Sequence, residues 1–491
     1  MKKAQILIYI LIYNAIALII LTGIISWVYI FYSTVTKEIE KKKAVAIAES
    51  GIEYYRWRLN HFPKDYTDGT GRSGPYIHNF ENRIGNIIGQ FELEITPPLI
   101  GSTIVKIKST GKLNFSKVEK IIESKLAIPS LIKFSVLSDD NVRFGQGTVV
   151  YGQIHSNKGI RFDGIAYNLI SSALITYDDP DHSGCNEWAV HTHIPPQDPC
   201  PPSNPDPNTL PPRSDIFKAG REVGRPMVDF VGLSANLAQL KDIASSSGFY
   251  RPFSGDNKYG YEIILKENGT FDLYRVDKVK NFPSNCCAYD PYEFNNTTCY
   301  RLNSRYLYGT WSIDQKTFLG NYNIPTNGVI FIEDNIWVSG KINNKRLIIA
   351  SAKFPENPNE RTRIIINKDL IYTNYNGNDS IGLIAQKSIT VGLESEDDLR
   401  IDAALIAQSG RAGRFHYNGT CGNNSIKTNL TIFGTIASRI RYGFAWVSGN
   451  NLVSGYQNRN LIYDANLLYS PPPEFPLASE FYETLDWQEI K

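Results

Sequence analysis

The sequence lacks the charge imbalance that would direct it to a polyanionic partner. Its 491 residues contain 51 Lys and Arg against 49 Asp and Glu, a formal net charge of +2. Proteins that bind nucleic acid neutralise phosphates with an excess of positive charge, and this balance supplies no such excess. We therefore predict that nucleic acid is not a partner.

The sequence also lacks the common catalytic motifs. It has no glycine-rich phosphate loop, no Gly-x-Ser-x-Gly turn and no His-Glu-x-x-His motif. Acidic residues do cluster, as in sugar-cleaving enzymes: Asp139, Asp140, Glu394, Glu396, Asp397, Asp398 and Asp402. Because they lie beside expected turns, where solvated Asp is routine, we expect a non-catalytic protein without a cofactor. A polysaccharide lyase or hydrolase built on a β-helix is the alternative.

Long apolar runs are absent except at the N-terminus, where no charged residue occurs between Gln5 and Phe31. As a helix rising about 1.5 Å per residue, this run would reach about 40 Å and cross a hydrocarbon core about 30 Å thick. We predict a basic leader and a transmembrane helix within residues 1–36. The span includes Ile6, Asn14, Gly23 and Trp27. A cleaved signal peptide is the alternative, but the run is long for one and no small-x-small site follows it.

The charges that flank this span leave its orientation ambiguous. Four lysines follow the span and outnumber Lys2 and Lys3 before it: Lys37, Lys41, Lys42 and Lys43. We call the chain beyond the span the passenger. The positive-inside rule alone would keep the passenger in the cytoplasm, but long domains translocate largely regardless of flanking charge. We expect a single-pass protein in contact with membrane lipid, with its N-terminus cytoplasmic and its passenger at the cell surface.

An amphipathic extension of the helix is predicted at residues 37–62. Apolar residues recur there at spacings of three and four: Val45, Ala48, Ile52, Tyr55 and Leu59. No proline separates this stripe from the span, so we predict one helix from Gln5 to about Asn60. The stripe is expected to pack on a small module of strands at 63–130, where period-two alternation begins near Phe91.

The first 130 residues resemble the type IV pilin and pseudopilin family, especially PilX-type minor pilins. Three features carry the likeness: the basic leader before the apolar run, the segment AVAIAESGIEYY at 44–55, and GQFELEITPPLIGSTIVKIKSTGK at 89–112, which looks like a pilin-type strand hairpin. The resemblance implies a pilin-like α+β module and partnership with other pilins or filament subunits. A plain single-span protein with a juxtamembrane helix is the alternative.

The resemblance also implies removal of the leader between Ala4 and Gln5. Tyr9 would then be the fifth residue of the processed chain, where pilins usually have Glu. Some minor and tip-located members of the family also lack this carboxylate. The departure therefore argues against a major filament subunit.

Short strands punctuated by Gly, Asn and Asp follow this module. An apolar-x-Gly-x-Ile pattern occurs at 150–154, 338–342 and 432–436, and NVRFGQG at 141 is echoed by GIRFDGI 18 residues later. Such repetition is typical of a stacked solenoid. We predict a mainly β protein in which a parallel β-helix has its first rungs at 131–177 and its main rungs at 326–450. A β-sandwich passenger is the alternative.

A Pro- and Cys-rich insertion is predicted between these rungs, at 178–325. It contains an expected helix at 228–247 and a hairpin around Asn268 and Gly269. Because long loops on a rigid scaffold often carry binding function, we expect it to meet a surface ligand or a carbohydrate. The aromatic and Pro-rich tail, 451–491, is expected to cap the solenoid.

Five of the six cysteines lie in this insertion. An even number of cysteines in an exported chain indicates disulfides. We expect Cys185 to pair with Cys200, and Cys299 to pair with one of the neighbours Cys286 and Cys287.

Three histidines flank the first of these cysteine pairs: His182, His191 and His193. Together with Cys185 they offer the ligand types that zinc prefers. Their spacing matches no familiar zinc module. We therefore expect a disulfide and no metal at this place.

Overall fold

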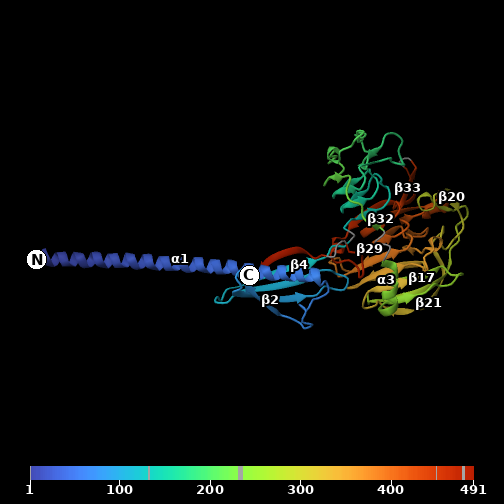
Figure 1. Cartoon of the computed structure of the whole chain (residues 1–491). Helices are drawn as coiled ribbons and strands as arrows, with labels where there is room; N and C mark the ends of the chain where they lie inside the picture. Colours follow the sequence, from blue (N-terminus) through green and yellow to red (C-terminus); the bar gives the residue numbers. More distant parts are fainter. Residues whose placement is uncertain (1, 131–132, 231–235, 449–450, 478–480, 491) are drawn as a thin grey trace. The chain divides into compact units, whose positions relative to one another are not determined.

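The chain consists of a long N-terminal helix and a mostly β remainder (Figure 1). The computed structural model describes residues 2–130, 133–230, 236–448, 451–477 and 481–490. Contacts divide the chain into two compact units. The first unit comprises Met1–Pro98, Ile104–Ile128 and Glu480–Lys491, and the second comprises Leu99–Thr103 and Pro129–Ser479.

Helix α1 runs without interruption over Lys2–His61. Its 60 residues extend about 90 Å at about 1.5 Å per residue. The hydroxyls of Thr34 and Thr36, both weak helix formers, donate hydrogen bonds of 2.8 and 2.9 Å to the carbonyls of Ile30 and Tyr32 one turn earlier. The backbone therefore stays helical where the apolar run ends, and the predicted continuity is confirmed.

An antiparallel five-stranded sheet completes the first unit. Its strands, in spatial order, are β1 (Tyr76–Glu81), β2 (Ile87–Thr96), β3 (Val105–Leu113), β4 (Glu119–Ala127) and β35 (Glu483–Ile490). The hairpin expected at 89–112 is the β2–β3 pair. β35 comes from the tail that we expected to cap the solenoid. It pairs instead with β4, whose backbone groups would otherwise be an open edge.

The C-terminal half of α1 packs on this sheet. Its buried residues are Ala44, Ile47, Ala48, Gly51, Ile52, Tyr55 and Leu59. Four of these residues, Ala48, Ile52, Tyr55 and Leu59, belong to the expected stripe, whereas its fifth member, Val45, is half-buried. A Cβ on Gly111 of β3 would lie 2.2 Å from the carbonyl oxygen of Ala44, so this glycine lets the helix approach the strand closely.

The second unit is dominated by a 22-stranded sheet with three parallel ladders. The first ladder runs in spatial order through β16 (Phe249–Arg251), β22 (Val329–Ile332), β24 (Arg346–Ser351), β27 (Ser380–Ala385), β29 (Asp398–Ala407), β32 (Ile426–Ser438), β5 (Val136–Ser138), β8 (Ile154–Ser156), β11 (Ile170–Ser172) and β15 (Arg221–Glu222). One column of buried aliphatic side chains follows it: Ile330, Ile349, Leu383, Leu405, Ile436, Val136, Ile154 and Ile170.

The other two ladders pass beside the first. One joins β17 (Gly260–Leu265), β23 (Ile336–Ile342), β25 (Ile364–Ile365), β28 (Ile389–Val391) and β30 (Ala412–Arg414). The other leads from β23 through β26 (Leu370–Tyr372), β29, β32, β34 (Asn451–Tyr463), β7 (Val149–Val150) and β10 (Ile165–Ala166). Antiparallel pairing is confined within this sheet to β17 with β18 (Thr270–Val279), β18 with β21 (Ile313–Asn323), and β33 (Ala445–Ser448) with β34, among the described strands.

Smaller elements decorate these ladders. Three short sheets are formed by β6 (Val142–Phe144), β9 (Ile160–Phe162) and β14 (Val190–His191); by β12 (Thr176–Tyr177) and β13 (Glu187–Trp188); and by β19 (Ala288–Asp290), β20 (Asn296–Tyr300) and β31 (His416–Tyr417). The helices are α3 (Asn236–Ser247) and α4 (Pro291–Phe294). Part of the helix expected at 228–247 lies outside the described residues.

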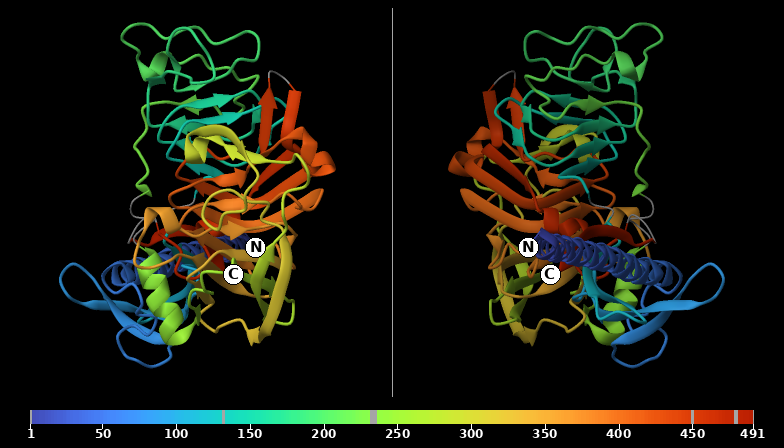
Figure 2. Two further views of the ribbon diagram at one scale, coloured as in Figure 1. Left: turned by 90° about the vertical axis from the view of Figure 1, so that its right-hand side faces the viewer. Right: turned by 90° about the vertical axis from the view of Figure 1, so that its left-hand side faces the viewer.

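The order of strands in space differs from their order in the sequence. β5, near the start of the second unit, pairs with β32, which lies about 300 residues later, and strands 136–172 continue the stack from there (Figure 2). β15, β16 and β17 also join the ladders, although we expected residues 178–325 to form an insertion. β34 of the expected tail pairs with β32 and β7. A strand at the edge of a sheet exposes unpaired backbone groups, and each of these segments supplies hydrogen-bond partners for such groups.

Replacing Ile52 by Asp should destabilise the first unit by about 3 kcal/mol or more, because a carboxylate would replace a side chain that is 2% exposed in the apolar cluster beneath α1. Faster amide hydrogen exchange in β2 and β3 of the full chain in detergent would report the loss. Trp57→Asp is the control, since Trp57 is 55% exposed on the same helix. Equal exchange rates in Ile52→Asp and the unaltered protein would contradict the packing.

Candidate functional site

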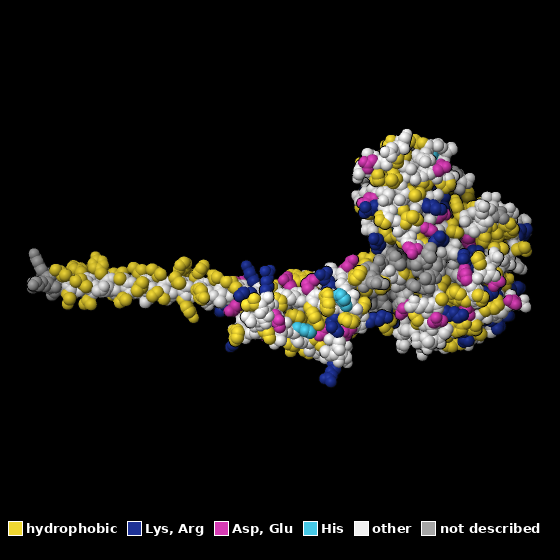
Figure 3. All heavy atoms as spheres, in the orientation of Figure 1, with side chains coloured by type: hydrophobic (Ala, Val, Ile, Leu, Met, Phe, Trp, Pro, Cys, Tyr) yellow, Lys and Arg dark blue, Asp and Glu magenta, His cyan; other side chains and the backbone are white. Residues whose placement is uncertain are grey.

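The N-terminal half of α1 presents an apolar surface with no protein contact to cover it. Its side chains are exposed from Ile6 to Tyr32 and form a rod that is mostly hydrophobic (Figure 3). Ile6, Asn14, Gly23 and Trp27, which we assigned to a membrane span, all lie on it. Among the described residues, α1 is the one helix long and apolar enough to cross a membrane. Such a surface normally marks contact with lipid or protein.

The candidate processing junction lies at the start of the same helix. Ala4 and Gln5 belong to the first turns of α1. Their side chains lie outside the described set. Cleavage between Ala4 and Gln5 therefore stays a prediction.

A cavity of about 500 Å³ in the second unit is lined by five arginines: Arg143, Arg161, Arg411, Arg441 and Arg459. We call it the arginine cavity. Arg143 and Arg161 stand opposite each other in the pairing of β6 with β9, which is the structural outcome of the 18-residue echo in the sequence. The other three come from segments beyond residue 400, so nothing local in the sequence indicated that they would join the first two.

Four of these arginines are neutralised by carboxylates. Arg161 Nε lies 2.8 Å from Asp163, and Arg441 Nη2 lies 2.8 Å from Asp181. Arg143 approaches Asp181 at 3.6 Å, and Arg411 Nη1 lies 3.1 Å from both carboxylate oxygens of Asp290. These pairs fix the guanidinium groups in the wall and offset their charge.

Arg459 is the exception. It donates hydrogen bonds to the carbonyl oxygens of Tyr456 at 2.7 Å and Gln457 at 2.9 Å, and among the described residues it has no ion-pair partner. Arg459 is half-buried, and desolvation lowers its pKa below the usual value. An anion that entered the cavity would give this guanidinium a counter-ion.

Aromatic rings complete the wall of the arginine cavity. The Arg411 guanidinium lies 5.2 Å from the ring centre of Trp446, and the Arg441 guanidinium lies 4.8 Å from that of Tyr292. Stacking on a ring holds a planar guanidinium in one orientation. The cavity thus combines fixed hydrogen-bond donors with flat apolar faces.

None of the acidic residues singled out in the sequence lines this cavity, and two of them, Asp402 and Asp397, bond to neighbouring residues. Asp402 is buried, and its carboxylate accepts hydrogen bonds from the Tyr372 amide at 3.0 Å, the Tyr375 hydroxyl at 2.7 Å and Arg400 Nε at 2.9 Å. Asp397 accepts from the amide and the hydroxyl of Thr428. Carboxylates engaged in this way are poor candidates for a catalytic acid and base.

All six cysteines form disulfides. Cys185 pairs with Cys200, and Cys287 pairs with Cys299, which are pairings that the sequence allowed. Cys286 pairs with Cys421 across 135 residues, a bond that sequence spacing did not indicate. The antiparallel pairing of β19 with β31 brings these two cysteines together.

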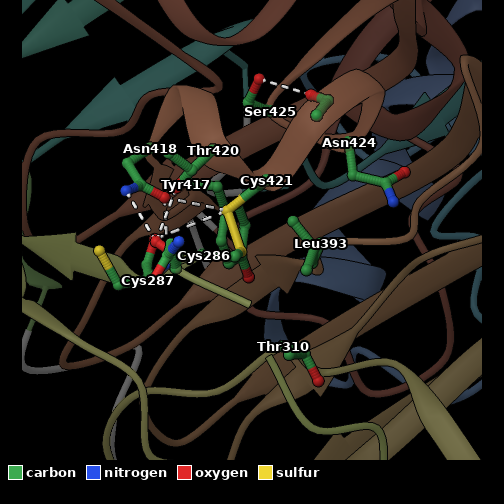
Figure 4. Close-up of a disulfide and its surroundings, with 12 residues drawn as sticks. Cys286, Cys287, Thr310, Leu393, Tyr417, Asn418, Thr420, Cys421, Asn424 and Ser425 are labelled. Atoms are coloured by element: carbon green, nitrogen blue, oxygen red, sulfur yellow. Dashed lines mark hydrogen bonds between the residues drawn. A yellow bond between two sulfur atoms is a disulfide. The ribbon is translucent and has the colours of Figure 1, made fainter. Parts of the chain in front are cut away.

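The surroundings of the long-range bond are ordered by Asn418 (Figure 4). Its side-chain oxygen accepts a hydrogen bond of 3.0 Å from the backbone amide of Cys287, and its backbone amide donates to the Cys287 carbonyl at 3.2 Å. The Thr420 hydroxyl donates to the Asn285 carbonyl at 2.6 Å. These bonds align the segment of Cys421 with that of the vicinal cysteines.

The three histidines that flank Cys185 are brought together. The ring centres of His182 and His193 are 4.5 Å apart, and those of His191 and His193 are 5.0 Å apart. Cys185 and Cys200 are bonded to each other, so neither is a free thiolate ligand.

The two disulfides that start from the adjacent residues Cys286 and Cys287 should differ in their contribution to stability. Removing Cys286–Cys421 with paired Ala substitutions should lower the free energy of unfolding by about 5 kcal/mol, and removing Cys287–Cys299 by about 3 kcal/mol, because the closed loops span 135 and 12 residues. Urea unfolding of the full chain measures both. An equal or smaller loss on removing the long-range bond would contradict this order.

Comparison with known proteins gives a structural likeness but no sequence match. No protein-family model matches the sequence, and no curated protein matches it. Among solved structures, the chain is similar to the crystal structure of the competence-associated pilin ComZ from Thermus thermophilus, with a TM-score of 0.30 and 10% sequence identity over 92% of this chain and 98% of that one. At so low a TM-score the function of this chain must be argued from its own helix and strands.

Proposed function

We propose that this chain is a membrane-anchored, minor pilin-like protein of a type IV pilus or a related filament system. The division of α1 carries the proposal: its first half is apolar and uncovered, whereas its second half is buried on an antiparallel sheet. A helix divided in this way can lie in lipid, or among the helices of other subunits, while it supports a folded head. Tyr9 in place of the usual Glu favours a minor subunit.

The passenger is a parallel β-helix in this proposal. The parallel ladders and the aliphatic column from Ile330 to Ile170 support a stacked solenoid. A β-sandwich would instead be built from antiparallel hairpins, which are a minority of the described pairings. The rungs serve as a scaffold, and no catalytic step is assigned to them.

The disulfides support an extracytoplasmic compartment for the passenger. Three bonds that engage every cysteine favour an oxidising environment, which the cytoplasm does not provide. The passenger therefore lies outside the cytoplasm, at the cell surface, and the N-terminus lies inside. The lysines beyond the span do not exclude this orientation, because long domains translocate despite such charges.

N-terminal sequencing of the membrane-extracted protein tests the pilin reading. The mature chain should begin at Gln5. Ala4→Leu should block processing, because the cleaved bond follows a small residue in the proposed leader, whereas the control Lys3→Arg should be processed normally. An unprocessed wild-type chain, or its absence from sheared filaments, would instead favour a tethered adhesin unrelated to pili.

A second function is supported by Arg459, whose charge lacks a counter-ion in the arginine cavity. We propose that the cavity binds an acidic carbohydrate of the cell surroundings. Its volume suits one or two sugar rings, and its guanidinium groups can hold a carboxylate.

Binding of a uronic-acid disaccharide, measured by calorimetry, tests this second proposal. Arg459→Ala should weaken binding roughly tenfold or more, because a charge-assisted hydrogen bond is lost. Arg439→Ala removes the same charge from an exposed residue that pairs with Asp139, and it should leave binding unchanged. Equal affinity for the neutral disaccharide, or an equal loss in both variants, would overturn the proposal.

A further inference from the structure

We propose that the second unit binds one divalent transition-metal ion, zinc by its donor chemistry, between His182, Glu187 and His193. These residues offer two imidazole nitrogens and a carboxylate oxygen within 4.8 Å of one another. Zinc accepts this donor set in three-ligand sites that keep one position open. The cysteines that first suggested a metal are not part of the site.

The distances suit a zinc ion. His182 Nδ1 lies 3.2 Å from Glu187 Oε1, and His193 Nε2 lies 3.7 Å from the same oxygen. Tetrahedral bonds of about 2.0–2.2 Å place ligand atoms about 3.3–3.6 Å apart. The three side chains therefore need only small movements to surround an ion.

The backbone that carries these ligands is fixed before any ion binds. Glu187 lies in β13, opposite Tyr177 of β12, and the Cys185–Cys200 disulfide closes the loop that carries Glu187 and His193. The His193 amide donates a hydrogen bond of 2.8 Å to Asp163 Oδ1. The His182 amide donates to the Asp179 carbonyl at 3.0 Å. Preorganised ligands of this kind lower the cost of binding.

Buried polar atoms without a hydrogen-bond partner lie beside His193. His191 is fully buried, and neither of its ring nitrogens has a hydrogen-bond partner. Its Nε2 lies 3.5 Å from Asp179 Oδ2, another buried atom without a hydrogen bond. Buried polar atoms left in this state call for an unseen ion or water.

Asp179, His191 and His193 form a second group of possible ligands that shares His193 with the first. Arg161 Nη1 lies 3.7 Å from Asp179 Oδ2, so a cation bound in this inner group would face a guanidinium. In the outer group, His182, Glu187 and His193, the carboxylate of Glu187 pairs with histidines and with no arginine among the described residues. His182, whose side chain is 36% exposed, also gives an ion a route from solvent.

The position links the metal to the arginine cavity, because His193 also lines that cavity. A bound divalent cation would add positive charge to its wall. The inference does not depend on carbohydrate binding and can be tested without it.

Zinc binding to the full chain in detergent, after chelator treatment and dialysis, tests the proposal. The protein should bind one zinc per chain, and cobalt should give the visible absorption of a tetrahedral site. His182→Ala should weaken zinc binding at least about tenfold. The matched control His78→Ala removes a histidine of the first unit that pairs with Asp68, and it should bind zinc normally.

The proposal would be overturned by the absence of stoichiometric zinc in the unaltered chain, by zinc affinity unchanged in His182→Ala, or by equal losses in the His182 and His78 variants. Glu187→Gln, which keeps the shape of the side chain, provides the second variant. Retained zinc affinity in this variant, with an unaltered thermal transition, would likewise exclude the outer group.

Discussion

The second unit depends on the parallel hydrogen bonding that places Ile436 of β32 beside Val136 of β5. The strands of this unit are short, several only two or three residues long, and such strands cannot bury a core alone. Stacking supplies the missing apolar surface and satisfies both backbone edges. Because β5 and β32 are about 300 residues apart, the last part of the stack can form only after most of this unit has been synthesised.

The first unit depends on a different balance, in which one helix meets two environments. The run before Phe31 has no charge and leaves its side chains exposed, and such a surface normally marks contact with lipid or protein. Beyond it, small residues such as Ala44, Ala48 and Gly51 allow close contact with the sheet. The sequence of α1 thus encodes both an exposed apolar half that could span a membrane and a half that packs on the sheet.

Local features were predictable because their information lies within a few residues. The continuous helix, the β2–β3 hairpin and the Cys185–Cys200 disulfide follow from periodicity, turn residues and spacing, whereas spacing left Cys299 two possible partners, Cys286 and Cys287. One glycine pattern also reflects a close approach: Gly434 has φ 150°, and a Cβ there would lie 2.0 Å from the Ala403 carbonyl oxygen. The β4–β35 pair and Cys286–Cys421 were missed, because a single sequence carries no signal for contacts between distant segments.

The same limit applies to the arginine cavity, and its cause is the strand order. Arg143 and Arg161 belong to strands near the start of the second unit, whereas Arg441 and Arg459 follow β32. They share a cavity because β5 pairs with β32 and β7 pairs with β34. The long-range pairing that closes the stack therefore also assembles the cavity. His193 lies at this wall through β14, which pairs with the strand of Arg161.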